Sequence, residues 1–193
     1  MPSEPKPGSG GKSRSDAGNP DAALPPVVNG WIVLPHPLLL DQLERLVAAA
    51  EAERAKRGAG APDGPNTKLA AAILHLMMRE VPEDPARSRY RHGGALAEKL
   101  KHWLRAKFGN GRFRLFFRYR SSDPKIIVFV WVNDSDTLRT YGSSTDAYAV
   151  FRRMLGAGNP PDDWEALVRA ASAPENLQRA KRLLGRVEQQ END

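Results

Sequence analysis

The stretch WLRAKFGNGRFRLFFRYR, which runs from Trp103 to Arg120, decides the fold. Apolar and charged residues alternate along it with a period of two, the period of a β-strand. Gly109-Asn110-Gly111 in its middle is typical of a hairpin turn. Ser121-Ser122-Asp123-Pro124 is a second turn, and a segment rich in Ile, Val, Phe and Trp follows it. The pattern predicts three antiparallel strands in a meander, over residues 103–108, 111–119 and 125–133.

The alternation also sorts the charged side chains onto one face of the predicted sheet. That face would carry Trp103, Arg105, Lys107, Arg112, Arg114, Phe116, Arg118 and Arg120, and the opposite face would be apolar. Arginine binds phosphate oxygens in a bidentate way and aromatic rings stack on unpaired bases, so this face predicts RNA binding. The alternative is a set of solvated surface cations. Like charges on neighbouring strands repel, however, and an anion between them relieves the repulsion.

The positive charge of the chain is concentrated around this sheet. The whole chain has 29 Lys and Arg against 23 Asp and Glu, a net charge of +6. Residues 89–153 alone hold fourteen basic and five acidic residues, a net charge of +9, so the remainder is slightly acidic. A concentration of this kind attracts a phosphate backbone or an acidic partner protein.

Helical periodicity and turn residues organise the chain on either side of the sheet. Residues 1–27 are rich in Pro, Gly, Ser and Asp, which predicts a disordered tail. Two helices, from about His36 to Gly58 and from Asn66 or Thr67 to Val81-Pro82, would form a helical hairpin. After the sheet, a helix capped by Ser144 or Thr145 would precede helices that open at Pro160-Pro161 and Pro174. The expected class is α+β, with one domain over residues 28–172 and an extra C-terminal helix over residues 173–193.

Composition excludes several kinds of chemistry. The 193 residues include no cysteine, so disulfides, thiol nucleophiles and thiolate metal sites are absent. The four histidines (His36, His75, His92 and His102) lack metal-ligand spacing, and no paired carboxylates lie near the basic strands. We therefore expect no metal and no other cofactor. The longest apolar run, Ile126 to Val132, is too short for a membrane helix, and no secretory signal opens the chain, so we expect a cytoplasmic protein with no membrane partner.

If the protein cleaves RNA, it would do so without a metal ion. The 2′-hydroxyl would attack the adjacent phosphorus, while Arg and Lys stabilise the charge of the transition state. A Lys, Tyr or His with a shifted pKa would transfer the protons. The residue pattern leaves the identity of that group open.

Short motifs spread over residues 27–168 occur in the order of a known family. They are Val28-Asn29-Gly30-Trp31, His36-Pro37, Arg91-His92-Gly93, Lys107-Phe108-Gly109, residues 111–119, Asn133-Asp134, residues 137–142, residues 145–148, Val150-Phe151, Pro160-Pro161 and residues 163–165. These motifs closely resemble the YhaV family, toxins of type II toxin–antitoxin systems within the RelE superfamily. The resemblance implies a RelE-like fold, with an antiparallel sheet between an N-terminal helical hairpin and C-terminal helices. It also implies an endoribonuclease that inhibits translation and growth by cutting mRNA.

The same resemblance implies particular partners. The toxin would be held in a hetero-oligomer by a PrlF-like antitoxin, which is an AbrB-type DNA-binding protein. Operator DNA would be bound only through that complex. The mRNA would be the substrate, either free or presented by the ribosome.

The resemblance further implies the site residues. RelE-type toxins place two Lys and an Arg where this chain has Arg105, Lys107 and Arg114. Tyr141 lies near the C-terminal Tyr that such toxins use, and Arg139 is the candidate for the Arg after the last strand. Arg105 departs from the pattern, because it stands where such toxins have a Lys. A guanidinium is a poor general base, so Arg105 is a weaker candidate for that role. The candidates for RNA binding are His92, Arg112, Arg118 and Asn133.

Alternative roles and functions stay open. Lys107 could act as a base or only position a phosphate, Tyr141 could be a packing residue, and His92 could fix a loop. The protein could also be a non-catalytic RNA- or ribosome-binding module, or one whose basic face binds only an acidic antitoxin segment. The presence of Lys107, Arg114 and Tyr141 together favours the nuclease.

Overall fold

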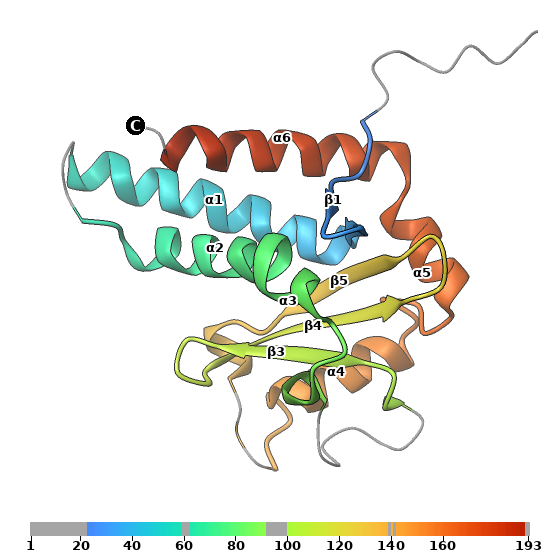
Figure 1. Ribbon diagram of the computed structural model, residues 1–193. Coiled ribbons are helices and arrows are strands. Elements are labelled where there is room, and N and C mark those ends of the chain that lie inside the picture. The colour runs from blue at the N-terminus through green and yellow to red at the C-terminus, as the bar shows by residue number, and fades with distance from the viewer. Residues whose placement is uncertain (1–22, 59–61, 92–99, 139, 141, 192–193) are drawn as a thin grey trace, which may run out of the picture.

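The computed structural model describes residues 23–58, 62–91, 100–138, 140 and 142–191, and it contains one sheet between two layers of helices (Figure 1). The five strands, in the spatial order β1-β2-β5-β4-β3, are β1 (Val27–Val28), β2 (Trp31–Pro35), β3 (Leu104–Phe108), β4 (Phe113–Arg120) and β5 (Ile126–Val132). The main helices are α1 (Pro37–Arg57), α2 (Pro65–His75), α4 (Ala147–Gly156), α5 (Trp164–Ala171) and α6 (Pro174–Glu191). A π-helical turn (Leu76–Glu80) and α3 (Val81–Glu83) extend α2, and short 3₁₀ turns lie at Ser88–Tyr90 and Ser135–Thr137. The class is α+β, which confirms the prediction.

The predicted meander forms one side of the sheet, because β3, β4 and β5 are consecutive antiparallel neighbours. The sequence pattern did not predict β1 and β2. β2 pairs in parallel with β5, and β1 pairs antiparallel with β2, so the sheet is mixed and not purely antiparallel. Val33 and Leu34 of β2 are buried on opposite faces of the sheet. A short strand buried on both faces lacks the alternation that reveals a strand.

Helices cover both faces of the sheet (Figure 1). On one face, α1, α2 and α6 contribute Leu43, Ile73 and Leu183 to a core that includes Leu115 and Phe117. On the other face, α4 and α5 pack their apolar side chains against a second core. The members of that core include Phe116, Val128, Val130, Trp131, Tyr148, Phe151, Trp164 and Leu167.

The second core corrects the expectation of an open arginine face. Phe116, which interrupts the arginine series of β4, is completely buried, and its ring stacks on Phe151 of α4 at a centroid distance of 4.2 Å. Phe116 is paired with Trp131, whereas Phe117 is paired with Phe129, so β5 has a bulge at Val130. The bulge turns Val130 and Trp131 to the same face. The helices pack on these apolar side chains, and the cations are divided between the two ends of the β3–β4 hairpin.

The C-terminal helix α6 lies along α1 (Figure 1). Arg179 donates to the two carboxylate oxygens of Glu44 at 3.0 and 2.9 Å and also binds Asp41. Arg186 and Glu51 form a second ion pair between the same helices, at 2.6 Å. The segment predicted as an extra helix thus contributes to the core of the domain. In the described ranges, no helix combines the length and the apolar character needed to cross a bilayer.

A buried histidine caps the first long helix. His36 is 2% exposed, and its Nδ1 accepts a hydrogen bond from the backbone N–H of Leu38 at 3.3 Å. Burial lowers the pKa of His36 from 6.5 to about 4, although Asp41 acts in the opposite direction. Since only the neutral ring can accept this bond, the folded protein binds fewer protons than the unfolded chain between these two values.

We therefore expect stability to depend on His36 in mildly acidic solution. The contribution is complete above pH 6.5 and is lost as the pH falls toward about 4, by about 3 kcal/mol at most. Urea denaturation at a series of pH values measures this change. His36→Asn keeps a capping acceptor and does not titrate, so its profile should be flatter over this range. An unchanged slope in the variant would assign the acid sensitivity to other groups.

Candidate active site

The β3–β4 turn brings two of the predicted site residues opposite each other. Lys107 of β3 is paired with Arg114 of β4, and Lys107 is exposed. Gly109, Asn110 and Gly111 have φ values of 57°, 56° and 77°, so the turn needs residues that tolerate left-handed backbone. Because like charges at directly opposite positions repel, the pair is suited to hold an anion.

Arg114 is fixed in place from two directions. It is 6% exposed, and its Nη1 donates to the backbone oxygens of Gly111 at 3.1 Å and Arg112 at 3.4 Å. Asn133 accepts the backbone N–H of Arg114 at 2.6 Å and donates to the Arg112 oxygen at 3.1 Å. The buried Nε of Arg114 has no hydrogen-bond partner among the described residues. Buried donors without a partner are uncommon, and a phosphate oxygen would complete this one.

Tyr148 of α4 lies between two of the arginines. Its hydroxyl accepts a hydrogen bond from Nε of Arg105 at 2.9 Å, and the Arg114 guanidinium lies over its ring at 5.7 Å. Arg105 is 6% exposed and also donates to the backbone oxygen of Arg89 at 2.9 Å, so it is a buried, positioning residue in this structure. Sequence reasoning missed Tyr148, because a tyrosine near the start of a helix is usually a packing residue. Its only signal was the resemblance of residues 145–148 to the family.

Asp146 holds α4 in this position. It caps α4 in place of the expected Ser144 or Thr145, since its Oδ1 accepts the backbone N–H of Tyr148 at 3.0 Å. Its Oδ2 accepts the backbone N–H of Thr140 at 2.8 Å. The Thr140 backbone is therefore attached to the start of α4, next to Tyr148.

Three predicted site residues, His92, Arg139 and Tyr141, lie outside the described residues. Of the predicted RNA-binding residues, Arg112 is exposed beside the turn, with its guanidinium 5.7 Å from the Phe113 ring. Asn133 is 1% exposed, and the two polar groups of its side chain bind the backbone of Arg112 and of Arg114, so it supports Arg114 from inside the fold.

Arg118 lies apart from the turn, toward the other end of β4. Its guanidinium is placed between the rings of Trp103 at 5.2 Å and Trp164 at 5.3 Å. Its Nη1 donates to the backbone oxygen of Asp162 at 2.6 Å, and burial lowers the pKa of Arg118 below its usual range. These contacts join α5 to the sheet, so the structure does not bring Arg118 together with Lys107.

We call the residues around the turn, Arg105, Lys107, Arg112, Arg114 and Tyr148, the turn cluster. None of its four cations forms an ion pair with a carboxylate of the described residues. Uncompensated guanidinium and ammonium groups, two of them buried, favour an anionic ligand and stabilise negative charge that develops on it. Within the described part of the chain, no three His, Asp or Glu side chains are grouped so as to hold a metal ion.

Comparison with known proteins agrees with this geometry. Residues 33–172 match the model of a family described as a toxin with endonuclease activity, of a toxin–antitoxin system. The chain is 44% identical over 147 residues to the ribonuclease toxin YhaV of Escherichia coli K12, which covers 76% of this chain and 95% of that protein. It is likewise 44% identical over 145 residues to toxin YhaV of Escherichia coli O6:H1, covering 75% of this chain and 94% of the relative. No solved structure matches the chain.

The family match spans the whole sheet from Val33 onward and both helical layers except α6, and it includes every residue of the turn cluster. The relatives have the same name as the family and are matched over nearly their whole length. The chain therefore belongs to the YhaV family of toxins with endonuclease activity, the toxin components of toxin–antitoxin systems.

Proposed function

We propose that this protein is a metal-independent endoribonuclease that cuts mRNA and thereby inhibits translation and growth. The observation that carries the proposal is the turn cluster, in which the buried Nε of Arg114 lacks an acceptor while Lys107 is exposed opposite it. A relative with 44% identity is named a ribonuclease toxin.

The chemistry that suits this cluster is transfer of the phosphodiester to the neighbouring 2′-oxygen. The 2′-hydroxyl loses its proton to a base and attacks phosphorus, so that a 2′-oxygen–phosphorus bond forms. The bond from phosphorus to the 5′-oxygen breaks, and an acid gives that oxygen a proton. The products are a 2′,3′-cyclic phosphate and a 5′-hydroxyl, and negative charge is greatest on the non-bridging oxygens in the transition state.

We assign the roles within this reaction as follows. Arg114 binds a non-bridging oxygen, because its Nε is the donor without a partner. Lys107 supplies the second positive charge or transfers a proton. Arg105 acts through Tyr148, because the hydrogen bond between them keeps the Arg105 and Tyr148 side chains in place. Tyr141 and Arg139 are candidates for proton transfer and phosphate binding through the resemblance, as is His92 for RNA binding. Arg112 contacts the RNA directly, whereas Arg118 and Asn133 act indirectly.

We also propose the partners of the toxin. Membership of the family implies an antitoxin, and we infer that it is a PrlF-like protein of the AbrB type in a hetero-oligomer with this chain. Binding to operator DNA would occur only through that complex. The site of action is the cytoplasm, where mRNA is available with or without the ribosome.

Cleavage of a labelled single-stranded RNA in the presence of EDTA tests the function. We expect 5′-labelled products that end in a cyclic phosphate, and no cut at a position where the 2′-hydroxyl is replaced by hydrogen. A parallel reaction in a translating extract determines whether the ribosome is required. RNA that is bound but left intact under both conditions would support the non-catalytic module instead. Loss of cleavage in EDTA would contradict the metal-independent reaction.

A further inference from the structure

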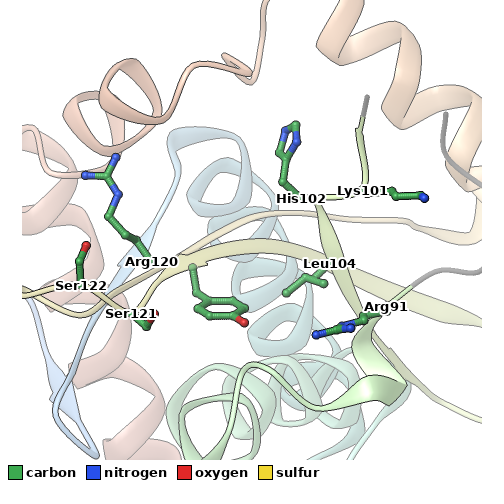
Figure 2. A pocket seen from close by; sticks show the side chains of 8 residues that line it. Arg91, Lys101, His102, Leu104, Arg120, Ser121 and Ser122 are labelled. Atoms are coloured by element: carbon green, nitrogen blue, oxygen red, sulfur yellow. The ribbon is translucent and has the colours of Figure 1, made fainter. Parts of the chain in front are cut away.

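A cavity lies at the end of the β3–β4 hairpin opposite to the turn cluster. Its volume is about 740 Å³, within the usual range of small-ligand sites. Figure 2 shows Arg120 and the two serines along one side of the opening and Arg91, Lys101, His102 and Leu104 along the other. The lining residues are Arg91, Lys101, His102, Leu104, Tyr119, Arg120, Ser121 and Ser122. Four of these described lining residues are basic and none is acidic.

Two of the basic groups are held by acidic side chains, one just before α5 and one in its first turn. Nε2 of His102 lies 2.7 Å from Oδ1 of Asp162, and Nη2 of Arg120 lies 2.7 Å from Oε1 of Glu165. By contrast, no hydrogen bond or ion pair with another described residue engages the guanidinium of Arg91. In Figure 2 this guanidinium is directed toward the middle of the opening, whereas Lys101 points away from it. Arg91 is thus the cation that is available to a ligand in the cavity.

The remaining lining residues fit the other parts of a nucleotide. Tyr119 is half-buried and is held edge-on against Trp31 at a centroid distance of 5.8 Å, which fixes an aromatic ring in the wall. Leu104 adds apolar surface, and the exposed Ser121 and Ser122 add hydroxyl groups. Sites for single-stranded RNA combine a cation for phosphate, an aromatic ring for the base and polar groups for the sugar.

The cavity lies close enough to the turn cluster to bind the same strand. Leu104 of the cavity and Lys107 of the turn cluster are separated by about 10 Å of extended backbone on β3, and their side chains lie on opposite faces of the sheet. Because β3 is an edge strand, an RNA strand that reaches both sites would cross this edge. We propose that the cavity binds a nucleotide of the substrate RNA, a short distance along the strand from the phosphodiester that is cut, with Arg91 on its phosphate. The inference rests on the proposed function. It extends that function, since a substrate that binds at both ends of the hairpin must be single-stranded between them.

Binding of two probes of different length tests this inference. Both are labelled single-stranded RNAs with 2′-O-methyl groups, which the proposed reaction cannot cut. The short probe is a dinucleotide, which cannot reach from the turn cluster to the cavity, and the long probe has about sixteen nucleotides. Arg91→Ala should weaken binding of the long probe about tenfold, the usual effect of losing a bond to a charged group, and leave the short probe within about twofold. For the long probe, the slope of log K against log salt should fall by about 0.7, because one phosphate contact is lost.

Arg45→Ala is the matched control, since Arg45 is an exposed arginine of α1 that does not line the cavity. It should bind both probes as the wild type does. An Arg91→Ala protein that behaves like Arg45→Ala would overturn the inference, as would an equal loss for both probes, which would indicate a general effect of charge. In either case the wild-type protein still binds and cuts RNA, so the proposed function stands. If the wild type binds neither probe, the proposed function fails, and the inference fails with it.

Discussion

Lys107→Met should lower kcat for RNA cleavage about 100-fold or more and leave the free energy of unfolding within about 0.5 kcal/mol of the wild type. Lys107 is exposed, and its partner across the hairpin is Arg114. Removing its charge therefore affects the transition state and not the packing. Single-turnover cleavage of a labelled RNA measures the rate, and urea denaturation measures the stability. Lys68→Met, at an exposed position of α2, is the matched control and should cleave normally.

A second substitution at the same position separates the two roles proposed for Lys107. Lys107→Arg keeps the positive charge, but a guanidinium does not release its proton near neutral pH. If charge is what matters, the arginine variant should recover most of the wild-type rate. If proton transfer is what matters, it should be as slow as the methionine variant. Wild-type cleavage by Lys107→Met would remove Lys107 from the catalytic site.

Phe116→Ala should reduce the free energy of unfolding by about 3–5 kcal/mol, a large part of the stability of a domain of this size. The Phe116 side chain is completely buried in the core between the sheet and α4. Its ring stacks on Phe151 at 4.2 Å, meets Tyr148 edge-on at 5.8 Å and lies 5.5 Å from Trp131. The substitution leaves a cavity beneath the helix that holds Tyr148 in the turn cluster, so we expect cleavage to weaken as well.

Urea denaturation at neutral pH checks this prediction, provided that the dependence of the free energy on urea concentration stays that of the wild type. Phe116→Leu fills most of the same volume and should cost only about 1 kcal/mol. The difference between the two variants measures the packing of α4 on the sheet. Equal stability of Phe116→Ala and the wild type would mean that α4 does not pack on the sheet.

Local pattern was sufficient to predict much of the fold. The alternation from Trp103 to Arg120, the turn at Gly109–Gly111 and the helical periodicities predict the meander and most of the helices. The strand β2 was not predicted, because burial on both faces removes the alternation that would reveal it. Phe116 breaks the arginine series in the sequence, but only the packing of α4 explains why an aromatic residue is required there.

Part of the candidate site could likewise be predicted from local pattern, and part of it could not. Strand spacing alone places Lys107 opposite Arg114, so this half of the turn cluster could be predicted. Tyr148 could not, because its contact with Arg105 depends on how α4 lies on the sheet and on the capping of that helix by Asp146. The burial of Arg105 could not be predicted either, since a strand residue on a basic face is expected to be exposed. The cavity around Arg91 depends on segments that meet only in the folded chain.

The parallel pairing of β2 with β5 also has a consequence for biosynthesis. Val33 is paired with Ile127, so the centre of the sheet joins segments that leave the ribosome far apart in time. Because of this high contact order, the edge of β2 that pairs with β5 has no partner strand until β5 has emerged from the exit tunnel. The helix that carries Tyr148 emerges later still. We therefore expect the nascent chain to be catalytically silent until α4 has emerged and packed on the sheet.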